Sequence, residues 1–149
     1  MKLSVNINID ANKESVWKII TDIDNSVNNI SAIEKVEILE RPKKGLVGLK
    51  WRETRTMFGK TATEDMTIKE YTKNDYYKTH AESHGAIYES KLSVEESNKK
   101  TTLTMAFEAT PVTFGAKIMY TLMSFMIKGA MVKALQRDVE DIRKVAETL

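Results

Sequence analysis

Cysteine is absent from the 149 residues of this chain. Its absence excludes a disulfide framework and thiolate chemistry, and it is compatible with a reducing cytoplasm, where we expect the protein. Only two histidines occur, His80 and His84, and both lie in one short segment, so no Ser/His/acid catalytic set is evident. The formal net charge is only +2, and no basic stripe is interleaved with aromatic residues. We therefore expect no nucleic-acid partner.

Long hydrophobic runs are scarce. The segment MKLSVNINID at the N-terminus alternates polar and apolar residues, so we expect no secretion signal. The apolar run from Ile118 to Ile127 is shorter than the roughly 20 residues that a membrane-spanning helix needs. Repeats, linkers and low-complexity segments are not evident, while 42% of the residues are hydrophobic and 30% are charged. These values predict a single globular domain over 1–149.

Periodicity predicts one strand, two short helices, six strands and a long helix, in that order. Leu3, Val5, Ile7 and Ile9 alternate with polar residues, which is typical of a half-buried strand. Asp10 or Asn12 can cap the first helix, which we expect to run to about residue 22. The further predictions are a short helix at 26–33, strands at 36–41, 46–58, 61–72, 75–83, 86–95 and 100–110, and a closing helix at 114–148. Consecutive strands with short turns favour an antiparallel meander.

The closing helix carries apolar residues three or four positions apart. These positions are Ile118, Leu122, Phe125, Met126, Val132, Leu135, Val139, Ile142 and Leu149. The spacing predicts one continuous apolar stripe, which we expect to be buried against the concave face of the sheet. Met119, Met123 and Ile127 are left for another surface, which can be the short helices, a dimer partner or a membrane during transient contact.

The stretch around Trp51 places charges on an apolar strand face. If Gly59-Lys60 forms a two-residue turn, Phe58 faces Thr61 and Arg55 faces Glu64. Trp51, Glu53, Arg55, Glu64 and Met66 then share the inner face of the sheet, opposite a plainly polar outer face. Buried charges are costly unless they are paired. Two interpretations stay open: these charges line an internal cavity, or they are solvated at the end of a hairpin that projects past the helix.

The remaining inner wall is apolar with scattered hydroxyl groups. A turn at His84-Gly85, with Ser83 facing Ala86, directs several side chains inward. The predicted ligand-binding positions are Trp51, Glu53, Arg55, Glu64, Met66, Tyr77, Ala81, Tyr88, Ser90, Met105, Phe107, Leu122 and Met126. Such a mixture is typical of a pocket for a small molecule. His80, Glu82 and His84 also alternate, but we interpret them as an exposed polar edge and expect no metal and no cofactor.

The chain resembles the START-like, helix-grip superfamily, in its polyketide cyclase/dehydrase and lipid-transport group. The resemblance rests on the element order, on Val16-Trp17 through Asp22, on the third strand from Val47 to Arg55, and on the helix end from Asp138 to Leu149. It implies an α+β fold in which a curved seven-stranded antiparallel sheet grips a long C-terminal helix. Two short helices between strands 1 and 2 complete that fold. A deep cavity for a hydrophobic ligand is also implied.

Three functions are compatible with this resemblance, because the fold alone leaves function open. The first is binding or carriage of a lipid-like or polyketide-like molecule by a monomer or homodimer, with Arg55 orienting the polar head. The second is an aromatase/cyclase whose candidate catalytic residues are Glu53, Arg55 and Glu64. In it Glu53 or Glu64 acts as general acid or base, and Tyr77 or Tyr88 donates a hydrogen bond to a carbonyl. The third is a protein-interaction module.

Overall fold

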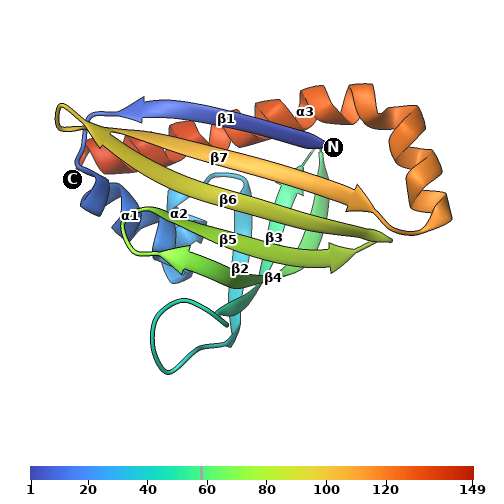
Figure 1. Ribbon diagram of the computed structural model, residues 1–149, viewed down its shortest axis with the longest axis horizontal. Coiled ribbons are helices and arrows are strands. Elements are labelled where there is room, and N and C mark those ends of the chain that lie inside the picture. Colours follow the sequence, from blue (N-terminus) through green and yellow to red (C-terminus); the bar gives the residue numbers. More distant parts are fainter. Residues whose placement is uncertain (58) are drawn as a thin grey trace.

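The computed structural model describes residues 1–57 and 59–149, and its elements follow the predicted order (Figure 1). The strands are β1 (Lys2–Ile9), β2 (Ile33–Glu40), β3 (Lys50–Met57), β4 (Lys60–Thr72), β5 (Tyr76–Ser83), β6 (Ala86–Ser97) and β7 (Lys100–Pro111). They form a seven-stranded antiparallel sheet in the order β1-β7-β6-β5-β4-β3-β2. The helices are α1 (Lys13–Thr21), η1 (Ile23–Asn25), α2 (Ser26–Asn29) and α3 (Phe114–Glu147). The predicted helix-grip fold is therefore confirmed.

The short helices close one end of the curved sheet. The side chain of Asn12, not of Asp10, caps α1 by accepting a 2.8 Å hydrogen bond from the Ser15 amide. Trp17 of α1 then meets Tyr77 of β5 edge to face, with ring centroids 6.1 Å apart. The second helix is shorter than the predicted 26–33, because α2 ends at Asn29 and β2 already begins at Ile33. Adjacent asparagines are weak helix formers, which accounts for its single turn.

The hairpin between β3 and β4 corrects the predicted register. Met57 pairs with Lys60, Glu53 with Glu64 and Trp51 with Met66. For each β3 residue, the predicted partner on β4 thus lies two positions beyond the observed one. The predicted Phe58–Thr61 pair includes residue 58, which lies outside the described ranges. Because side chains alternate with a period of two, a shift by two positions leaves every inner residue on the inner face. The prediction of the face was right although the pairing was wrong.

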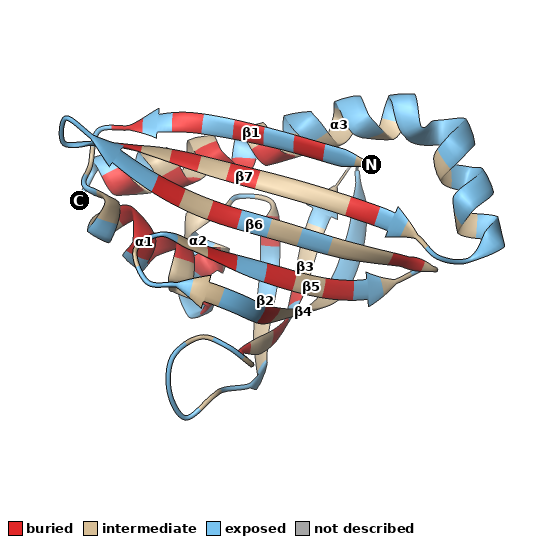
Figure 2. Ribbon diagram, viewed as in Figure 1, coloured by how far each residue is buried: buried red, intermediate tan, exposed pale blue. Residues whose placement is uncertain are grey.

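Helix α3 has two dissimilar halves, which corrects the prediction of one buried stripe (Figure 2). Its second half packs on the sheet and buries Leu135, Val139 and Ile142. Its first half curves around the far end of the sheet, and there Ile118, Leu122, Phe125 and Met126 are exposed. Val132 and Leu149 are exposed as well. Thirteen positions separate Leu122 from Leu135, which is not a whole number of turns at about 3.6 residues per turn, so the two side chains point to different sides.

Candidate functional site

A cavity of about 500 Å³ lies between the inner face of the sheet, the short helices and α3. Apolar side chains from α1 and η1, together with Ser26 and Asn29 of α2, form one wall. Another wall consists of Tyr120, Ile127, Met131 and Leu135 of α3. The predicted positions among its lining residues are Trp51, Glu53, Arg55, Glu64, Met66, Tyr77, Ala81, Tyr88, Ser90, Met105 and Phe107. Leu122 and Met126 are not among them, because they lie on the exposed side of α3 with 79% and 75% of their surface accessible.

Arg55 joins β3 to α3 through two ion pairs inside this cavity. Its Nε donates to Oε2 of Glu53 at 2.9 Å, and its Nη1 donates to Oδ2 of Asp138 at 2.9 Å. The side chains of Arg55, Glu53 and Asp138 are 19%, 8% and 3% exposed, respectively. Glu53 and Arg55 are mostly buried, so they are not solvated charges at the end of a projecting hairpin.

Glu64 and its neighbours extend the polar side of the cavity. Glu64 is half-buried and accepts a 2.8 Å hydrogen bond from the Ser83 hydroxyl across the β4–β5 pair. The hydroxyl groups of Thr79 and Ser90 bond to each other in the same wall. On the outer face, His80 lies 3.1 Å from Glu82 and 3.7 Å from Glu89. Within residues 1–57 and 59–149, no group of three potential metal-ligating side chains is close enough to hold an ion.

Asp138 is the cluster residue that the sequence interpretation missed. It belongs to α3, 83 positions after Arg55, so local periodicity does not connect the two. One signal was nevertheless present: Asp138 lies three positions after Leu135 and four before Ile142, on the stripe that the helix buries. A carboxylate at such a position needs a cationic partner.

Burial and charge act against each other in the cluster. Burial raises the pKa of Asp138, because Arg55 opposes the cost of burying that carboxylate only in part and Glu53 adds a like charge. Burial alone would lower the pKa of Arg55, but the charges of Glu53 and Asp138 more than offset this and raise it. Oδ1 of Asp138 is buried and has no hydrogen-bond partner among the described residues. Arg55 is thus held by two carboxylates and stays charged.

Tyr77 and Tyr88, the two predicted hydrogen-bond donors, differ in whether their hydroxyl groups are free to bind a ligand. Burial raises the pKa of both Tyr77 and Tyr88, so both phenols are neutral at physiological pH. Tyr77 donates its proton to the backbone oxygen of Ile20 at 2.9 Å, which occupies it structurally. Tyr88 instead accepts from the hydroxyl of Tyr120 on α3 at 3.1 Å and stacks on Phe107. Tyr88 lines the cavity, and the part of the chain that the structure describes offers no acceptor for its own proton.

Comparison with known proteins agrees with this architecture. The model of the polyketide cyclase / dehydrase and lipid transport family matches residues 1–143. A START superfamily protein from Mycobacterium smegmatis superposes with a TM-score of 0.78 and 16% identity, covering 99% of this chain and 97% of that one. The Zhui aromatase/cyclase from Streptomyces sp. R1128 superposes with a TM-score of 0.75 and 14% identity, covering 99% of this chain and 93% of that one. Ginseng major latex-like protein 151 from Panax ginseng superposes with a TM-score of 0.78 and 12% identity, covering 98% of this chain and 97% of that one.

The chain belongs to the polyketide cyclase / dehydrase and lipid transport family, as the sequence resemblance predicted. The solved structures share only its fold, because their identities are low. No match is found among curated protein sequences.

Proposed function

We propose that this protein binds and carries a small hydrophobic molecule, lipid-like or polyketide-like, in its internal cavity. The supporting observation is the composition of the cavity: apolar side chains from three helices and the sheet surround one compact charged cluster. A pocket of several hundred Å³ with a few convergent polar groups is the usual form of a small-molecule site. Family membership supports the same proposal.

The charged side chains that line the cavity restrict which charge the ligand's polar head can carry. Glu53, Glu64 and Asp138 line the cavity together with one guanidinium, that of Arg55, so the carboxyl groups outnumber the cation. Both ion pairs of Arg55 are made within the protein, and they leave the guanidinium already compensated. A ligand carboxylate would add a further negative charge in a region of low dielectric. We therefore expect a neutral or cationic head that donates hydrogen bonds.

A neutral fluorescent apolar probe, Nile red, tests binding in the cavity. Ala81 lines the cavity and is 6% exposed, so Ala81→Trp fills cavity space. Lys69→Trp on the exposed face of β4 adds the same indole outside and is the matched control. We expect saturable binding of one probe per chain, retained in Lys69→Trp and weakened about tenfold or more in Ala81→Trp. Equal binding by both variants would contradict the proposal.

Enzymatic catalysis is the second candidate, and one feature favours it. The Asp138 carboxyl, with its raised pKa, and the Tyr88 hydroxyl line the same cavity, so a proton donor and a hydrogen-bond donor can face one ligand. In a cyclase they would assist enolisation of a poly-β-ketone. Turnover that is lost in Asp138→Asn or Glu53→Gln, with probe binding retained, would support the enzyme. Binding without turnover would support the carrier.

Protein interaction is a weaker third candidate. A partner captured equally well by the wild-type protein and by Ala81→Trp would favour it. We propose that the carrier acts as a monomer or homodimer without nucleic acid, and that it contacts a membrane transiently when it exchanges its ligand.

A further inference from the structure

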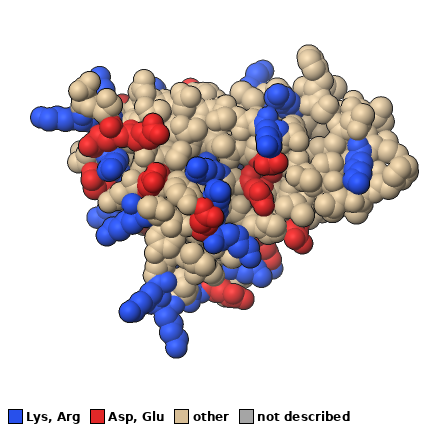
Figure 3. All heavy atoms as spheres, viewed as in Figure 1, with Lys and Arg blue, Asp and Glu red and all other residues tan. Residues whose placement is uncertain are grey.

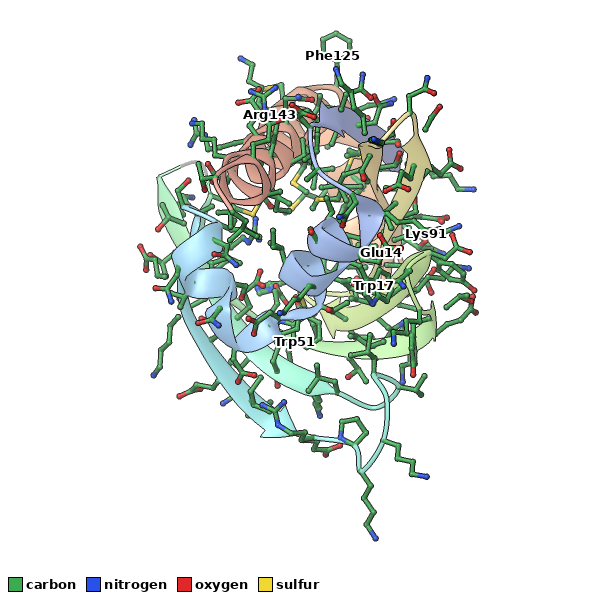
Figure 4. All side chains as sticks on the ribbon, turned by 90° about the vertical axis from the view of Figure 1, so that its left-hand side faces the viewer. Glu14, Trp17, Trp51, Lys91, Phe125 and Arg143 are labelled. Carbon is green, nitrogen blue, oxygen red and sulfur yellow. The ribbon has the colours of Figure 1, made fainter. Side chains whose placement is uncertain are left out.

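The first half of α3 carries an apolar surface that nothing in the described part of the chain covers. We name it the α3 front face, and it consists of Phe114, Ile118, Met119, Leu122, Met123, Phe125 and Met126. Phe125 is 93% exposed and Phe114 is 80% exposed, and Phe125 points away from the body of the molecule in Figure 4. Monomeric proteins rarely expose contiguous apolar surface without a binding role.

The front face lies opposite the side of α3 that lines the cavity. Tyr120, Ile127 and Met131 point to the cavity, whereas Ile118, Leu122 and Phe125 occupy the other side of the same turns. Among the described residues, the only side-chain hydrogen bond from residues 114–137 to the sheet is that of Tyr120 to Tyr88. A partner of the front face would thus sit one helix diameter from the cavity.

The charge around the front face is of one sign. No acidic residue occurs between Glu108 and Asp138, whereas Lys117, Lys128, Lys133 and Arg137 lie in that interval and are exposed. In Figure 3 the end of the molecule formed by this half of α3 is mostly tan, with a blue group and no red one on its visible side. Lys117 and Lys128 border the apolar residues, an arrangement typical of helices that lie in the interface of an anionic membrane.

The second half of α3 decides between lying on a membrane and crossing it. By length and composition alone α3 could span a bilayer. Only 6% of its most apolar 18-residue window is buried inside the protein. Its second half, however, is fixed in the protein by Leu135, Val139 and the ion pair of Asp138 with Arg55. Within the first half, Tyr120, Ile127 and Met131 line the cavity, and Tyr120 donates to Tyr88 of β6. Crossing would pull these side chains away from the sheet, so we place the helix on the membrane surface. A second copy is a poorer occupant, because a two-fold dimer through this face would bring like charges together.

We propose that the α3 front face docks on the surface of an anionic lipid bilayer, with its apolar side chains in the headgroup region and its lysines at the phosphates. The proposal of docking rests on the exposed apolar residues of the α3 front face and on the lysines that border them. Its role, to exchange the cavity ligand with the membrane, rests on the proposed carrier function.

Sedimentation with vesicles tests the docking. We expect the full-length protein to bind vesicles of mixed phosphatidylcholine and phosphatidylserine more tightly than vesicles of phosphatidylcholine alone. The double variant Leu122→Ser, Phe125→Ser should lose about tenfold or more in affinity for both, whereas Leu39→Ser, Val47→Ser, which removes exposed apolar residues elsewhere, should bind like the wild type. Lys117→Gln or Lys128→Gln should each cost about fivefold on the mixed vesicles only.

Two results would overturn the docking proposal. One is equal vesicle binding by the wild type and the Leu122→Ser, Phe125→Ser variant. The other is a wild-type dimer by light scattering that this variant converts to a monomer, because the face would then be a dimer interface. Nile red separates the two proposals. Probe binding without vesicle binding overturns docking alone, and vesicle binding without probe binding overturns the carrier function alone.

Discussion

At the scale of single residues, Arg55 holds the charged cluster together. It is the common partner of Glu53 and Asp138, and all three side chains are largely buried. Breaking a buried ion pair costs more than the pair contributes, because the remaining charge stays in a medium of low dielectric. The residue at 55 therefore matters for stability as well as for the character of the cavity.

We predict that Arg55→Met lowers the free energy of unfolding by about 3–5 kcal/mol at pH 7, because it leaves two carboxylates unpaired. The deficit should shrink as the pH is lowered from 7 to 4, since burial raises the pKa of Asp138 and its protonation removes one of the charges. Urea unfolding at the two pH values measures both effects. Arg52→Met is the control, because Arg52 pairs with Asp65 on the exposed face and its loss should change stability little. An equal deficit at both pH values would count against the buried cluster.

Asp138 supplies a second prediction with a defined sign. Its pKa in the folded protein is raised, so the folded state holds this proton more tightly than the unfolded chain does. The stabilising contribution of the protonated group is complete below the unfolded pKa of about 3.9 and is lost as pH rises through the folded pKa. Asp138→Asn cannot titrate. Its stability relative to the wild type should therefore increase from pH 4 to pH 7, and a decrease over that interval in matched unfolding curves would contradict the assignment.

At the scale of elements, the turn between β5 and β6 positions the start of α3. His84 and Gly85 both have positive φ, at 51° and 74°, as in a type I′ turn. The Gly85 carbonyl accepts hydrogen bonds from the amides of Val112 and Thr113, and Thr113 caps α3 by accepting from the Ala116 amide. One short turn thus orients the helix whose front face we propose as the membrane contact.

We predict that Gly85→Ala destabilises the protein more than Gly59→Ala does. Both glycines have φ near +74°, so each substitution places an alanine in the left-handed region at a cost of about 1–2 kcal/mol. Only at Gly85 would the added Cβ also meet the side chain of Thr113, at 3.0 Å from Cγ2 and closer to the hydroxyl oxygen. Thermal unfolding and the helical circular dichroism signal compare the two variants. Equal losses would show that the Gly85–Thr113 contact does not position α3.

How far the sequence predicts these elements depends on the range of the contacts involved. The alternation at Trp51, Glu53 and Arg55 predicts the inner face correctly, because strand faces follow from a local period of two. The partner of Arg55 on α3 is not predicted, since periodicity within β3 says nothing about a helix 83 residues later. The apolar spacing of α3 predicts a helix but not which half is covered, because coverage depends on where the sheet ends.

At the scale of the whole molecule, the apolar cavity and the apolar front face belong to one helix. The side chains of Tyr120 and Ile127 face inward while Leu122 and Phe125 face solvent, so docking of the front face would place a bilayer beside the cavity. The sequence resemblance correctly predicts the fold and the family. It does not predict the ligand, because the same fold surrounds different cavities in different members.

Native mass spectrometry of the protein purified from its own cells, followed by extraction of whatever is bound, tests the carrier function most directly. We predict a co-purifying hydrophobic species on the wild-type protein and on Lys69→Trp, and its loss from Ala81→Trp, which fills the cavity. The released species should carry a neutral or cationic head. A mass of the bare chain for the wild type, together with no thermal shift across lipids and polyketides, would contradict the carrier function.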